Sequence, residues 1–449
     1  MGLITLQQAA QWCGGCVNEK YKDVAFLGAN NDTRKIEKGQ LFVALQGVRD
    51  GHDFIDMARE KGAAAVLCTR CEQDIPAIVV PDTRIALGQI AAGERQRIGM
   101  KVVGVTGSVG KSTTKEMIVS VLESTYRVAK TPANHNNDIG MPMAVLAIPE
   151  DTQVAVLEMG MNHFREIAYL TDIAKPDVGV IINIGTMHIE HLGSRDGILQ
   201  AKLEILEGMS ENGCIVLNGD DDKLWNQDKT KNMKTVFFGS KNQKCGLCAT
   251  HVRQDGAWLS YEANGIPVEL PLEGEHYVLD SLAAVAVGLE LGVTPEKITE
   301  SLAAFRNMAG RQEIFDFNGM TIIQDCYNAG PESMAAALSV LGNRGGQRIA
   351  VLGDMLELGE RAPLEHEKVG ALAAQKAEIL LSFGPNSEKM VAGAVAAGMT
   401  NAWAFTERAE LTAALKQLAK PGDTILFKGS RGMRMELILE QFVAKVEDK

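Results

Sequence analysis

Positive charge is in deficit in this sequence. It contains 45 Lys and Arg residues against 57 Asp and Glu residues, and its formal net charge is −12. General nucleic-acid binding requires a basic face, so we expect no nucleic-acid partner. No apolar run approaches the ~18 residues that a membrane-spanning helix needs. The opening stretch MGLITLQQAAQWCGG also lacks the basic start and apolar centre of a secretory signal. We therefore expect a cytoplasmic protein without a membrane span.

Cysteine is scarce, but six of the eight cysteines form C-x-x-C pairs. The pairs are Cys13 with Cys16, Cys68 with Cys71, and Cys245 with Cys248. Such pairs are typical of zinc sites or redox centres. A redox pair should follow a strand, whereas WCGGC at 12–16 lies in a Leu/Ala/Gln segment that predicts a helix. We therefore favour reduced structural thiols and keep a zinc or redox role as the alternative.

Low-complexity linkers and short repeats are missing too, so changes in the pattern of apolar runs divide the chain. Each part alternates strand-like Val/Ile/Leu runs with helical segments, which predicts three α/β domains at 1–98, 99–309 and 310–449. The expected strands lie at 41–45, 63–67, 77–80, 101–107, 154–160, 178–185, 214–220, 320–325, 348–353, 378–384 and 423–429. Continuous apolar runs suit parallel strands covered on both faces. Residues 257–271 predict a hairpin, because Asn264-Gly265 is a strong two-residue turn signal.

The stretch VVGVTGSVGKSTTKEM at 102–117 has the layout of a phosphate-binding loop. An apolar strand runs into glycines that let the backbone approach an anion, and a helix start follows with its amides pointing at the phosphate. Lys111 can reach the terminal phosphates, and Ser112 can bind magnesium. The nucleotide-binding candidates are Gly107, Ser108, Gly110, Lys111, Ser112 and Thr113. The alternative is a glycine-rich turn with an incidental lysine.

The strict pattern G-x-x-x-x-G-K-[ST] is not met, because Val105 occupies the place of its first glycine. The observed spacing G-x-x-G-x-x-G-K-S resembles that of the Mur ligase family, and the resemblance extends along nearly the whole chain. It implies three α/β domains: a UDP-sugar-binding domain, a central parallel-sheet ATPase domain of P-loop type, and a C-terminal Rossmann-like domain. ATP and Mg²⁺ are the implied cofactors.

The resemblance also implies a catalytic and metal-binding set behind the loop. Glu158 ends the strand run VAVLE, where ligands gather at a sheet edge, and His188 follows the next strand. Lys202 matches a family lysine that is carbamylated, a change that needs the neutral amine favoured by burial. The implied magnesium ligands are Ser112, Glu158, His188 and Lys202. The implied catalytic residues are Lys111, Glu158, His188 and Lys202. A solvated acid, a structural histidine and an ordinary lysine are the alternatives.

Further residues are carried over from the same resemblance. The loop TPANHNNDIGMP and the segments GRQEIF and DCYNAGPES imply nucleotide contacts at Asn136, Asn137, Arg311, Asp325, Tyr327 and Asn328. The segment NDTRKIEKGQLFVALQGVRDGHDFI and the KGSRGMRME loop imply substrate contacts at Asp32, Thr33, Arg34, Gly47 and Arg431. Plain turns and an interdomain ion pair are the alternatives. The chain departs from the family pattern at Tyr277, Asp280 and Gln324, which leaves the adenine contact there in doubt.

GSVGKST, GDMLELGE and KGSRGMRME resemble the branch of the family that adds D-alanyl-D-alanine. The implied reaction joins D-Ala-D-Ala to UDP-MurNAc-tripeptide through an acyl phosphate, giving UDP-MurNAc-pentapeptide, ADP and phosphate. The alternatives are a ligase of the family that adds a different amino acid, such as the third residue, and a non-catalytic nucleotide-binding protein. We expect a monomer.

Overall fold

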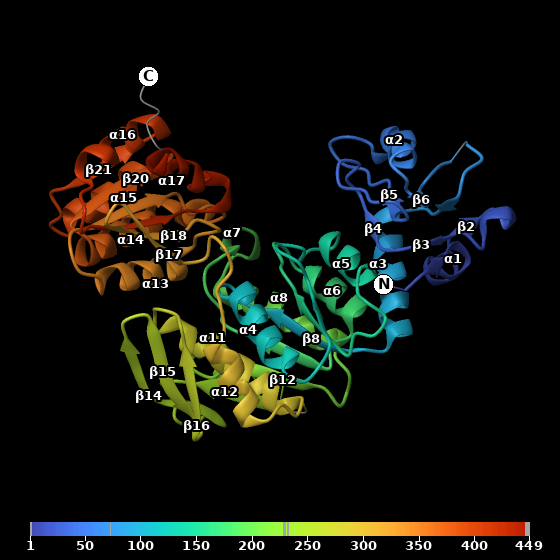
Figure 1. Ribbon diagram of the computed structural model, residues 1–449, viewed down its shortest axis with the longest axis horizontal. Coiled ribbons are helices and arrows are strands. Elements are labelled where there is room, and N and C mark those ends of the chain that lie inside the picture. The colour runs from blue at the N-terminus through green and yellow to red at the C-terminus, as the bar shows by residue number, and fades with distance from the viewer. Residues whose placement is uncertain (1, 72, 228–229, 231–232, 445–449) are drawn as a thin grey trace.

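Three α/β units follow one another along the chain in a computed structural model that describes residues 2–71, 73–227, 230 and 233–444 (Figure 1). Each unit has its own sheet, of five, nine and six strands in turn, and a two-stranded sheet accompanies the first. None of the helices in the described residues has both the length and the apolarity that crossing a bilayer requires. The α/β prediction is therefore confirmed, and the order of the units follows the sequence.

The first unit carries a five-stranded sheet in the order β2-β7-β6-β5-β4. The predicted runs at 41–45, 63–67 and 77–80 form its parallel strands β5, β6 and β7. Its elements are β1 (Ile4–Thr5), α1 (Leu6–Cys13), β2 (Cys16–Val17), β3 (Ala25–Phe26), β4 (Ala29–Asn30), β5 (Leu41–Val43), α2 (Ile55–Glu60), β6 (Ala65–Cys68), β7 (Ala77–Val79) and α3 (Thr83–Ile98). A capping box between Thr5 and Gln8 starts α1. The helix ends at Cys13, because Gly14 has φ 64°, so the predicted helix covers only the first two residues of WCGGC and Cys16 lies in β2.

The middle unit is built on a nine-stranded sheet in the order β16-β15-β14-β13-β12-β11-β8-β10-β9. Its strands are β8 (Lys101–Thr106), β9 (Val128–Lys130), β10 (Val154–Glu158), β11 (Val178–Ile181), β12 (Cys214–Asn218), β13 (Lys234–Gly239), β14 (Leu247–Asp255), β15 (Trp258–Ala263) and β16 (Ile266–Leu270). Strands β8, β10, β11 and β12 pair in parallel, as predicted, and β9, β13 and β14, which the sequence analysis did not predict, join them in parallel. Strands β15 and β16 extend the same sheet antiparallel. The hairpin turn is confirmed, because Asn264 and Gly265 both have positive φ, 48° and 85°.

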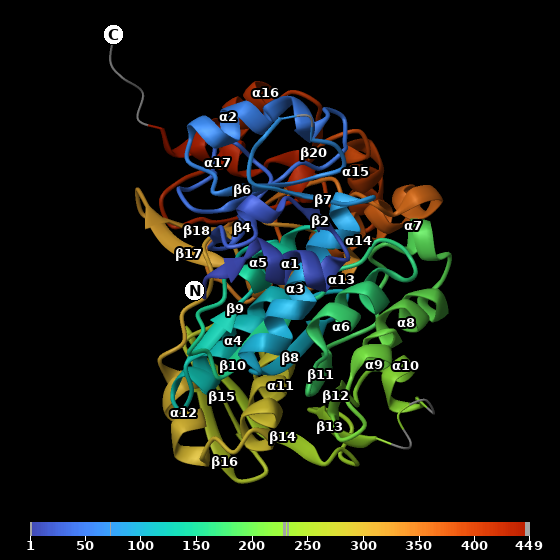
Figure 2. The ribbon, with the colours of Figure 1, turned by 90° about the vertical axis from the view of Figure 1, so that its right-hand side faces the viewer.

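Helices cover both faces of this sheet. They are α4 (Lys111–Glu123), α5 (Gly140–Leu146), α6 (Glu166–Ala174), α7 (Ile189–Leu192), α8 (Arg195–Leu203), α9 (Ile205–Gly208), α10 (Asp222–Trp225), α11 (His276–Glu290) and α12 (Pro295–Ala303). Helix α3 of the first unit packs between α1 on one side and α5 and α6 on the other (Figure 2). One apolar core therefore runs from the first unit into the middle unit, and α4 with α11 covers a second core on the opposite face.

The third unit has a six-stranded sheet in the order β17-β18-β22-β19-β20-β21, parallel except for the edge strand β17. Its elements are β17 (Glu313–Phe317), β18 (Met320–Asp325), α13 (Pro331–Gly342), β19 (Arg348–Gly353), α14 (Ala362–Lys376), β20 (Ile379–Phe383), α15 (Ser387–Ala396), β21 (Ala402–Phe405), α16 (Arg408–Leu418), β22 (Thr424–Lys428) and α17 (Glu436–Val443). All four strands predicted here are present. Apolar clusters on both faces fix the carboxyl ends of β18 and β22 toward one edge.

Short 3₁₀ helices lie at Glu19–Tyr21, Gly51–Phe54, Gly359–Arg361 and Arg431–Met433.

All eight cysteines are free, and Cys68 is buried at the end of β6, where burial raises the pKa of its thiol to about 12. A thiol with so high a pKa forms little thiolate, the species that attacks disulfides and binds zinc.

Candidate active site

The phosphate loop connects β8 to α4 on the middle sheet. Gly110 has φ 87°, the left-handed region that glycine adopts without a steric penalty. No side chain caps α4, so its first backbone amides are left for an external acceptor. Lys111 folds back over the loop and donates to the carbonyl oxygens of Gly107 and Ser108, at 2.7 and 3.3 Å. Burial lowers the pKa of Lys111, while the charge of Glu158 acts in the opposite direction.

Glu158 is the last residue of β10, and several groups orient its carboxylate. Its Oε2 accepts a hydrogen bond from Ser112 Oγ at 2.7 Å, and its Oε1 accepts one from Asn136 Nδ2 at 2.8 Å. Its backbone amide donates to Thr131 Oγ1 at 3.0 Å. The register of the sheet explains why Glu158 lies beside Ser112, because Glu158 is paired with Val105, just before the phosphate loop begins. The predicted acid and the loop serine therefore lie together.

His188 follows β11 and faces the third unit. Its φ is 64°, an uncommon value for a residue with a Cβ, and it immediately precedes α7. Its Nδ1 lies 2.8 Å from Glu357 Oε2, in the loop after β19. Burial lowers the pKa of His188, and the nearby imidazole lowers the pKa of Glu357. A histidine that stays neutral retains a nitrogen lone pair for a metal.

A cleft of about 780 Å³ runs between the middle and third units and joins these groups. Its lining includes predicted residues from both sides: Ser108, Gly110, Lys111, Ser112, Thr113, Asn136, Asn137, Glu158, His188, Arg311, Asp325, Tyr327, Asn328 and Arg431. The carboxyl ends of parallel strands from two sheets thus converge on one volume, the place where α/β folds bind ligands. The remaining candidates, Gly107, Lys202, Asp32, Thr33, Arg34 and Gly47, are not part of this lining.

The sequence matches three family models in consecutive parts of the chain. Residues 25–95 match the Mur ligase family catalytic domain, 105–288 the Mur ligase middle domain, and 310–431 the Mur ligase glutamate ligase domain. The UDP-N-acetylmuramoyl-tripeptide–D-alanyl-D-alanine ligase of Bacillus subtilis (strain 168) is 40% identical, with 96% of each chain covered. The chain belongs to the Mur ligase family.

Other relatives agree with this membership. The ligase of the same name from Escherichia coli (strain K12) is 36% identical and covers 93% of this chain and 94% of its own. A crystal structure of MurF from Acinetobacter baumannii superposes with a TM-score of 0.92 at 33% identity, covering 99% of this chain and 100% of that one. MurF ligase from Thermotoga maritima in complex with ADP gives 0.83 at 30% identity, covering 93% and 97%.

In this Mur ligase, Lys202 of α8 lies behind the cleft rather than in its lining. The residue is only 1% exposed, and burial together with the charge of Lys111 lowers its pKa well below the usual value for lysine. Lys202 also lowers the pKa of His188, so the three groups share one electrostatic environment. Within the described part of the chain, no hydrogen bond or ion pair occupies its amine. A buried amine in this setting favours the neutral form that carbamylation requires.

The residues present fit the magnesium ion that the family implies. Ser112 and Glu158 place two oxygens 2.7 Å apart in the cleft, and magnesium prefers oxygen ligands. The described residues contain no cluster of three or more His, Cys, Asp or Glu side chains placed to hold a metal. The predicted set of Ser112, Glu158, His188 and Lys202 contains two side chains of these types, and Lys202 would become an oxygen ligand only after carbamylation.

The Arg311 side chain of the third unit reaches across the cleft to the middle unit. Arg311 Nη2 donates to Ser112 Oγ at 2.8 Å, and the guanidinium lies 4.0 Å from the ring centre of Tyr327. Asp325 is paired with the buried Lys428 at 2.6 Å, and Lys428 also donates to the carbonyl oxygen of Asn328 at 3.0 Å. The predicted residues at 311 and 325–328 therefore form one cluster at the ends of β18 and β22.

The first unit holds its candidates apart from the cleft. Asp32 accepts hydrogen bonds from both the backbone and the guanidinium of Arg34, which lower the pKa of Asp32 to about 2. The Arg34 side chain is 85% exposed. The carbonyl oxygen of Thr33 accepts a hydrogen bond from Lys61 at 2.8 Å. At Gly47 an added Cβ would meet only the carbonyl oxygen of Arg49, at 3.8 Å, so the surface there is open.

Two of the departures from the family pattern lie in the middle unit, and Gln324 lies in the third. Asp280 accepts a hydrogen bond from Thr114 Oγ1 at 3.0 Å, and burial raises the pKa of Asp280 to about 7. The hydroxyl of Tyr277 accepts a hydrogen bond from Asn307 at 2.9 Å. Both residues line the cleft next to His276, whose pKa burial lowers to about 4. Gln324 is paired with Glu313 across β17 and β18.

The cleft lining includes residues that the sequence analysis did not single out, among them Asn183, Glu332, Glu357 and Lys428. Lys428 lies in the KGSRGMRME motif and Glu357 lies in the GDMLELGE motif. The sequence analysis therefore identified both segments but not these two side chains. Glu332 in α13 accepts hydrogen bonds from the backbone and the hydroxyl of Thr186, at 2.9 and 3.0 Å. Asn183 had one signal, a polar residue at the end of a buried strand.

Proposed function

We propose that this Mur ligase is an ATP-dependent amide ligase that joins D-Ala-D-Ala to UDP-MurNAc-tripeptide in the cytoplasm. One observation carries the proposal: the interdomain cleft places Lys111, Ser112, Glu158, His188 and Arg311 around one volume. Cations and uncapped helix amides suit a triphosphate, and the neighbouring carboxylate suits the metal that accompanies it. The names of the similar ligases supply the two substrates.

The proposed reaction is a transfer of the terminal phosphoryl group to a carboxylate. A carboxylate oxygen of the tripeptide attacks the γ-phosphorus, the bond from that phosphorus to the bridging oxygen breaks, and ADP leaves with the electron pair. The amine of D-Ala-D-Ala then attacks the acyl carbon and loses a proton, and phosphate departs. No enzyme nucleophile is needed, so the protein contributes positioning and charge stabilisation.

Each residue of the cleft then has a defined task. The amides at the start of α4 and the Lys111 ammonium hold the phosphates, and Arg311 reaches the same group from the third unit. Ser112, Glu158, His188 and carbamylated Lys202 would hold magnesium. When bound, Mg²⁺ neutralises charge between the two anions that must meet. Because both units contribute, closure of the cleft excludes water from the acyl phosphate.

The other assignments follow the same division of the chain. Residues 1–98 bind the UDP-sugar through Asp32, Thr33, Arg34 and Gly47, and 99–309 hold the phosphates. Residues 310–449 contribute Asp325, Tyr327 and Asn328 to the ribose and adenine, opposite Asn136 and Asn137. Arg431 is exposed in the loop after β22 and lies beside the cleft, so we assign it to the carboxylate of D-Ala-D-Ala.

Product analysis by mass spectrometry tests the proposal. The protein is incubated with ATP, magnesium and each of two UDP-MurNAc-tripeptides, ending in Lys or diaminopimelate, with or without D-Ala-D-Ala. We expect a UDP-MurNAc-pentapeptide and phosphate only when D-Ala-D-Ala is present. A parallel reaction offers UDP-MurNAc-dipeptide with L-Lys or diaminopimelate. Product in that reaction alone would assign the chain to a third-residue ligase, and ADP binding without any product would leave a non-catalytic protein.

A further inference from the structure

The segment 183–186 leaves β11 exactly where the phosphate loop leaves β8. The two strands pair in parallel up to Ile181 and Thr106, and the amide of Ile182 still donates to the carbonyl oxygen of Thr106 at 3.0 Å. Beyond this point the strand pairing ends, and the Ser108 amide still donates to the Asn183 carbonyl oxygen at 3.2 Å. Side-chain contacts therefore add to this main-chain bond in setting the position of the loop.

Asn183 supplies those contacts through both its side chain and its backbone. Its Oδ1 accepts from the Val109 amide and its Nδ2 donates to the Val109 carbonyl oxygen, each at 2.9 Å. The amide of Ser108 donates to the carbonyl oxygen of Asn183 at 3.2 Å, and the amide of Gly185 donates to Ser108 Oγ at 2.9 Å. A primary amide paired with both groups of one residue holds that residue as a strand neighbour would. The loop is thus fastened immediately before Gly110.

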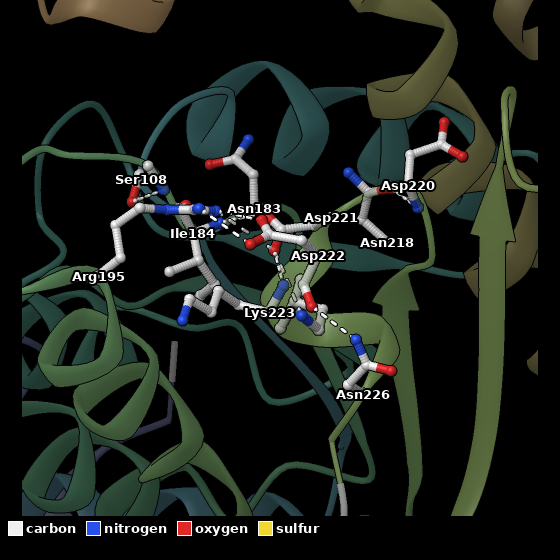
Figure 3. Close-up of polar contacts among 12 residues, drawn as sticks. Ser108, Asn183, Ile184, Arg195, Asn218, Asp220, Asp221, Asp222, Lys223 and Asn226 are labelled. Atoms are coloured by element: carbon white, nitrogen blue, oxygen red, sulfur yellow. Dashed lines mark hydrogen bonds and ion pairs between the residues drawn. The ribbon is translucent and has the colours of Figure 1, made fainter.

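The peptide groups of Ile184 fix the same segment from behind (Figure 3). The amide of Ile184 donates to Asp221 Oδ2 at 2.8 Å, and its carbonyl oxygen accepts from Arg195 Nε at 3.0 Å. The other oxygen of Asp221 caps α10 by accepting from the Lys223 amide at 2.9 Å. Arg195 places its two terminal nitrogens on the carboxylate of Asp222, at 3.1 and 2.6 Å. Two anchored side chains therefore hold the two consecutive peptide units on either side of the Ile184 Cα.

We infer that Asn183, supported by Asp221 and Arg195, is a positioning residue that fixes the phosphate loop for nucleotide binding. The inference rests on the proposed nucleotide site and adds the machinery that shapes it. With Ser108 and Val109 bonded to the 183–185 segment, the amides that remain to meet a phosphate are those at the start of α4. Arg195 begins the helix that carries Lys202, so the same contacts place Lys202 relative to the loop.

Asn183→Ala and Asp221→Asn test the inference against a matched control. Asp221→Asn retains an oxygen that can cap α10 but replaces the acceptor for Ile184 with a donor. Asp220→Asn is the control, because Asp220 accepts from the amides of Ser240, Lys241 and Asn242 and, among the residues that the structure describes, makes no hydrogen bond to the 183–186 segment. The Asp220→Asn variant therefore loses a comparable number of hydrogen bonds just after β12, the strand that Asp221 also follows.

Two measurements are made on each full-length variant, and the kcat/KM for ATP is determined beside them. ADP binding is measured by calorimetry, and hydrogen exchange of the peptide containing Ser108 and Val109 is followed by mass spectrometry without nucleotide. We expect Asn183→Ala and Asp221→Asn to weaken ADP binding by about 10-fold and to speed exchange of the loop peptide. The kcat/KM for ATP should fall by about 100-fold. Asp220→Asn should match the wild type in both measurements, even with a lower melting temperature.

The outcomes separate this inference from the proposed function. If the wild type does not bind ADP, the proposed nucleotide site is wrong, and loop exchange alone then decides whether Asn183 positions the loop. Unchanged loop exchange in Asn183→Ala and Asp221→Asn, or an equal change in Asp220→Asn, would overturn the inference. If Asn183→Ala does not fold, Asp221→Asn and Asn183→Asp, which retains the acceptor for the Val109 amide, provide the same comparison.

Discussion

The phosphate loop and the first-unit segment 31–47 both contribute candidate residues for phosphate groups, but the two regions hold them differently. At the phosphate loop, Lys111 and Ser112 are half-buried and buried; Lys111 donates to the Gly107 carbonyl oxygen, and Ser112 donates to the buried Glu158 at the end of β10. In segment 31–47, the Arg34 guanidinium donates a hydrogen bond to the Asp32 carboxylate, two residues earlier in the chain. The Arg34 side chain is exposed to solvent. The loop is organised before a ligand arrives, whereas the segment presents an exposed arm.

This difference sets how the two regions should respond to mutation. Charges fixed in a water-poor site stabilise a transition state strongly, because no reorganisation is needed when the reaction occurs. An exposed arginine gains less, since water screens its charge in the free protein. Changes to the loop should therefore act on kcat and on stability together. Changes to the segment should act on substrate binding alone.

Lys111→Ala should have the largest effect. It removes the ammonium that covers the loop and would meet the charge developing on the transferred phosphoryl group. We expect kcat to fall by about 1000-fold. The unfolding free energy should fall by about 1 kcal/mol, because the carbonyl oxygens of the buried Gly107 and Ser108 lose their donor. Phosphate release under saturating substrates measures kcat. A loss below about 10-fold would show that Arg311 and the helix amides suffice without the lysine.

Gly110→Ala should come next, because two steric penalties combine there. The backbone has φ 87°, and an added Cβ would lie 2.6 Å from Asp280 Oδ1. We expect the free energy of unfolding to fall by about 1–3 kcal/mol and ADP binding to weaken. Urea denaturation and calorimetry provide the two numbers. Wild-type stability in this variant would mean that the loop is free to relax, contrary to its dense hydrogen bonding.

The sequence predicted the loop side of the site well, because its signals are local. An apolar run, glycines at fixed spacing and a helix start need no distant partner to be read, and Asn264-Gly265 specified its turn equally well. The hairpin pairs with β14, which belongs to the same sheet as β8, the strand before the phosphate loop. This pairing depends on which edge strand of the sheet is left unpaired when the rest of the unit has folded. No local pattern encodes it.

The partners across the cleft escaped prediction for a related reason. Lys428 acts through Asp325, 103 residues earlier, and Glu357 meets His188 from another unit. Each appears in sequence as one charged residue among many. Only the family resemblance, which carries the geometry of a fold, linked Arg311 to the phosphate side. It did not extend to Asn183, whose role depends on how two strands separate.

Asp280→Asn should change how stability depends on pH. The pKa of Asp280 is about 7 in the folded protein, against about 3.9 when unfolded. Between these values the folded state keeps a proton that the unfolded state has released, so Asp280 makes stability fall as pH rises. Asn cannot ionise and retains the acceptor for Thr114. We expect the variant to be more stable than the wild type by up to about 4 kcal/mol at pH 8 and by less at pH 5. An equal difference at both pH values, measured by urea denaturation, would contradict the buried titration.

Arg34→Ala should act on substrate binding only. Its side chain is exposed and bonded to Asp32, so we expect the melting temperature to match that of the wild type. The KM for the UDP-linked substrate should rise by about 10-fold with kcat retained, because the contact is equal in ground and transition states. Steady-state kinetics at saturating ATP measure both constants. A fall in kcat would place Arg34 among the groups that act during the reaction.

Gly47→Ala should have the smallest effect and completes the comparison with Gly110→Ala. The two glycines were predicted for the same purpose, close backbone approach, but an added Cβ at Gly47 meets one carbonyl oxygen at 3.8 Å, an ordinary contact. We expect the melting temperature to match that of the wild type, since surface substitutions are usually within about 0.5 kcal/mol. A rise in KM for the UDP-linked substrate at unchanged stability would locate the ligand against this backbone. If KM is also unchanged, the diphosphate lies elsewhere on the first unit, and Arg34 must reach it without Gly47.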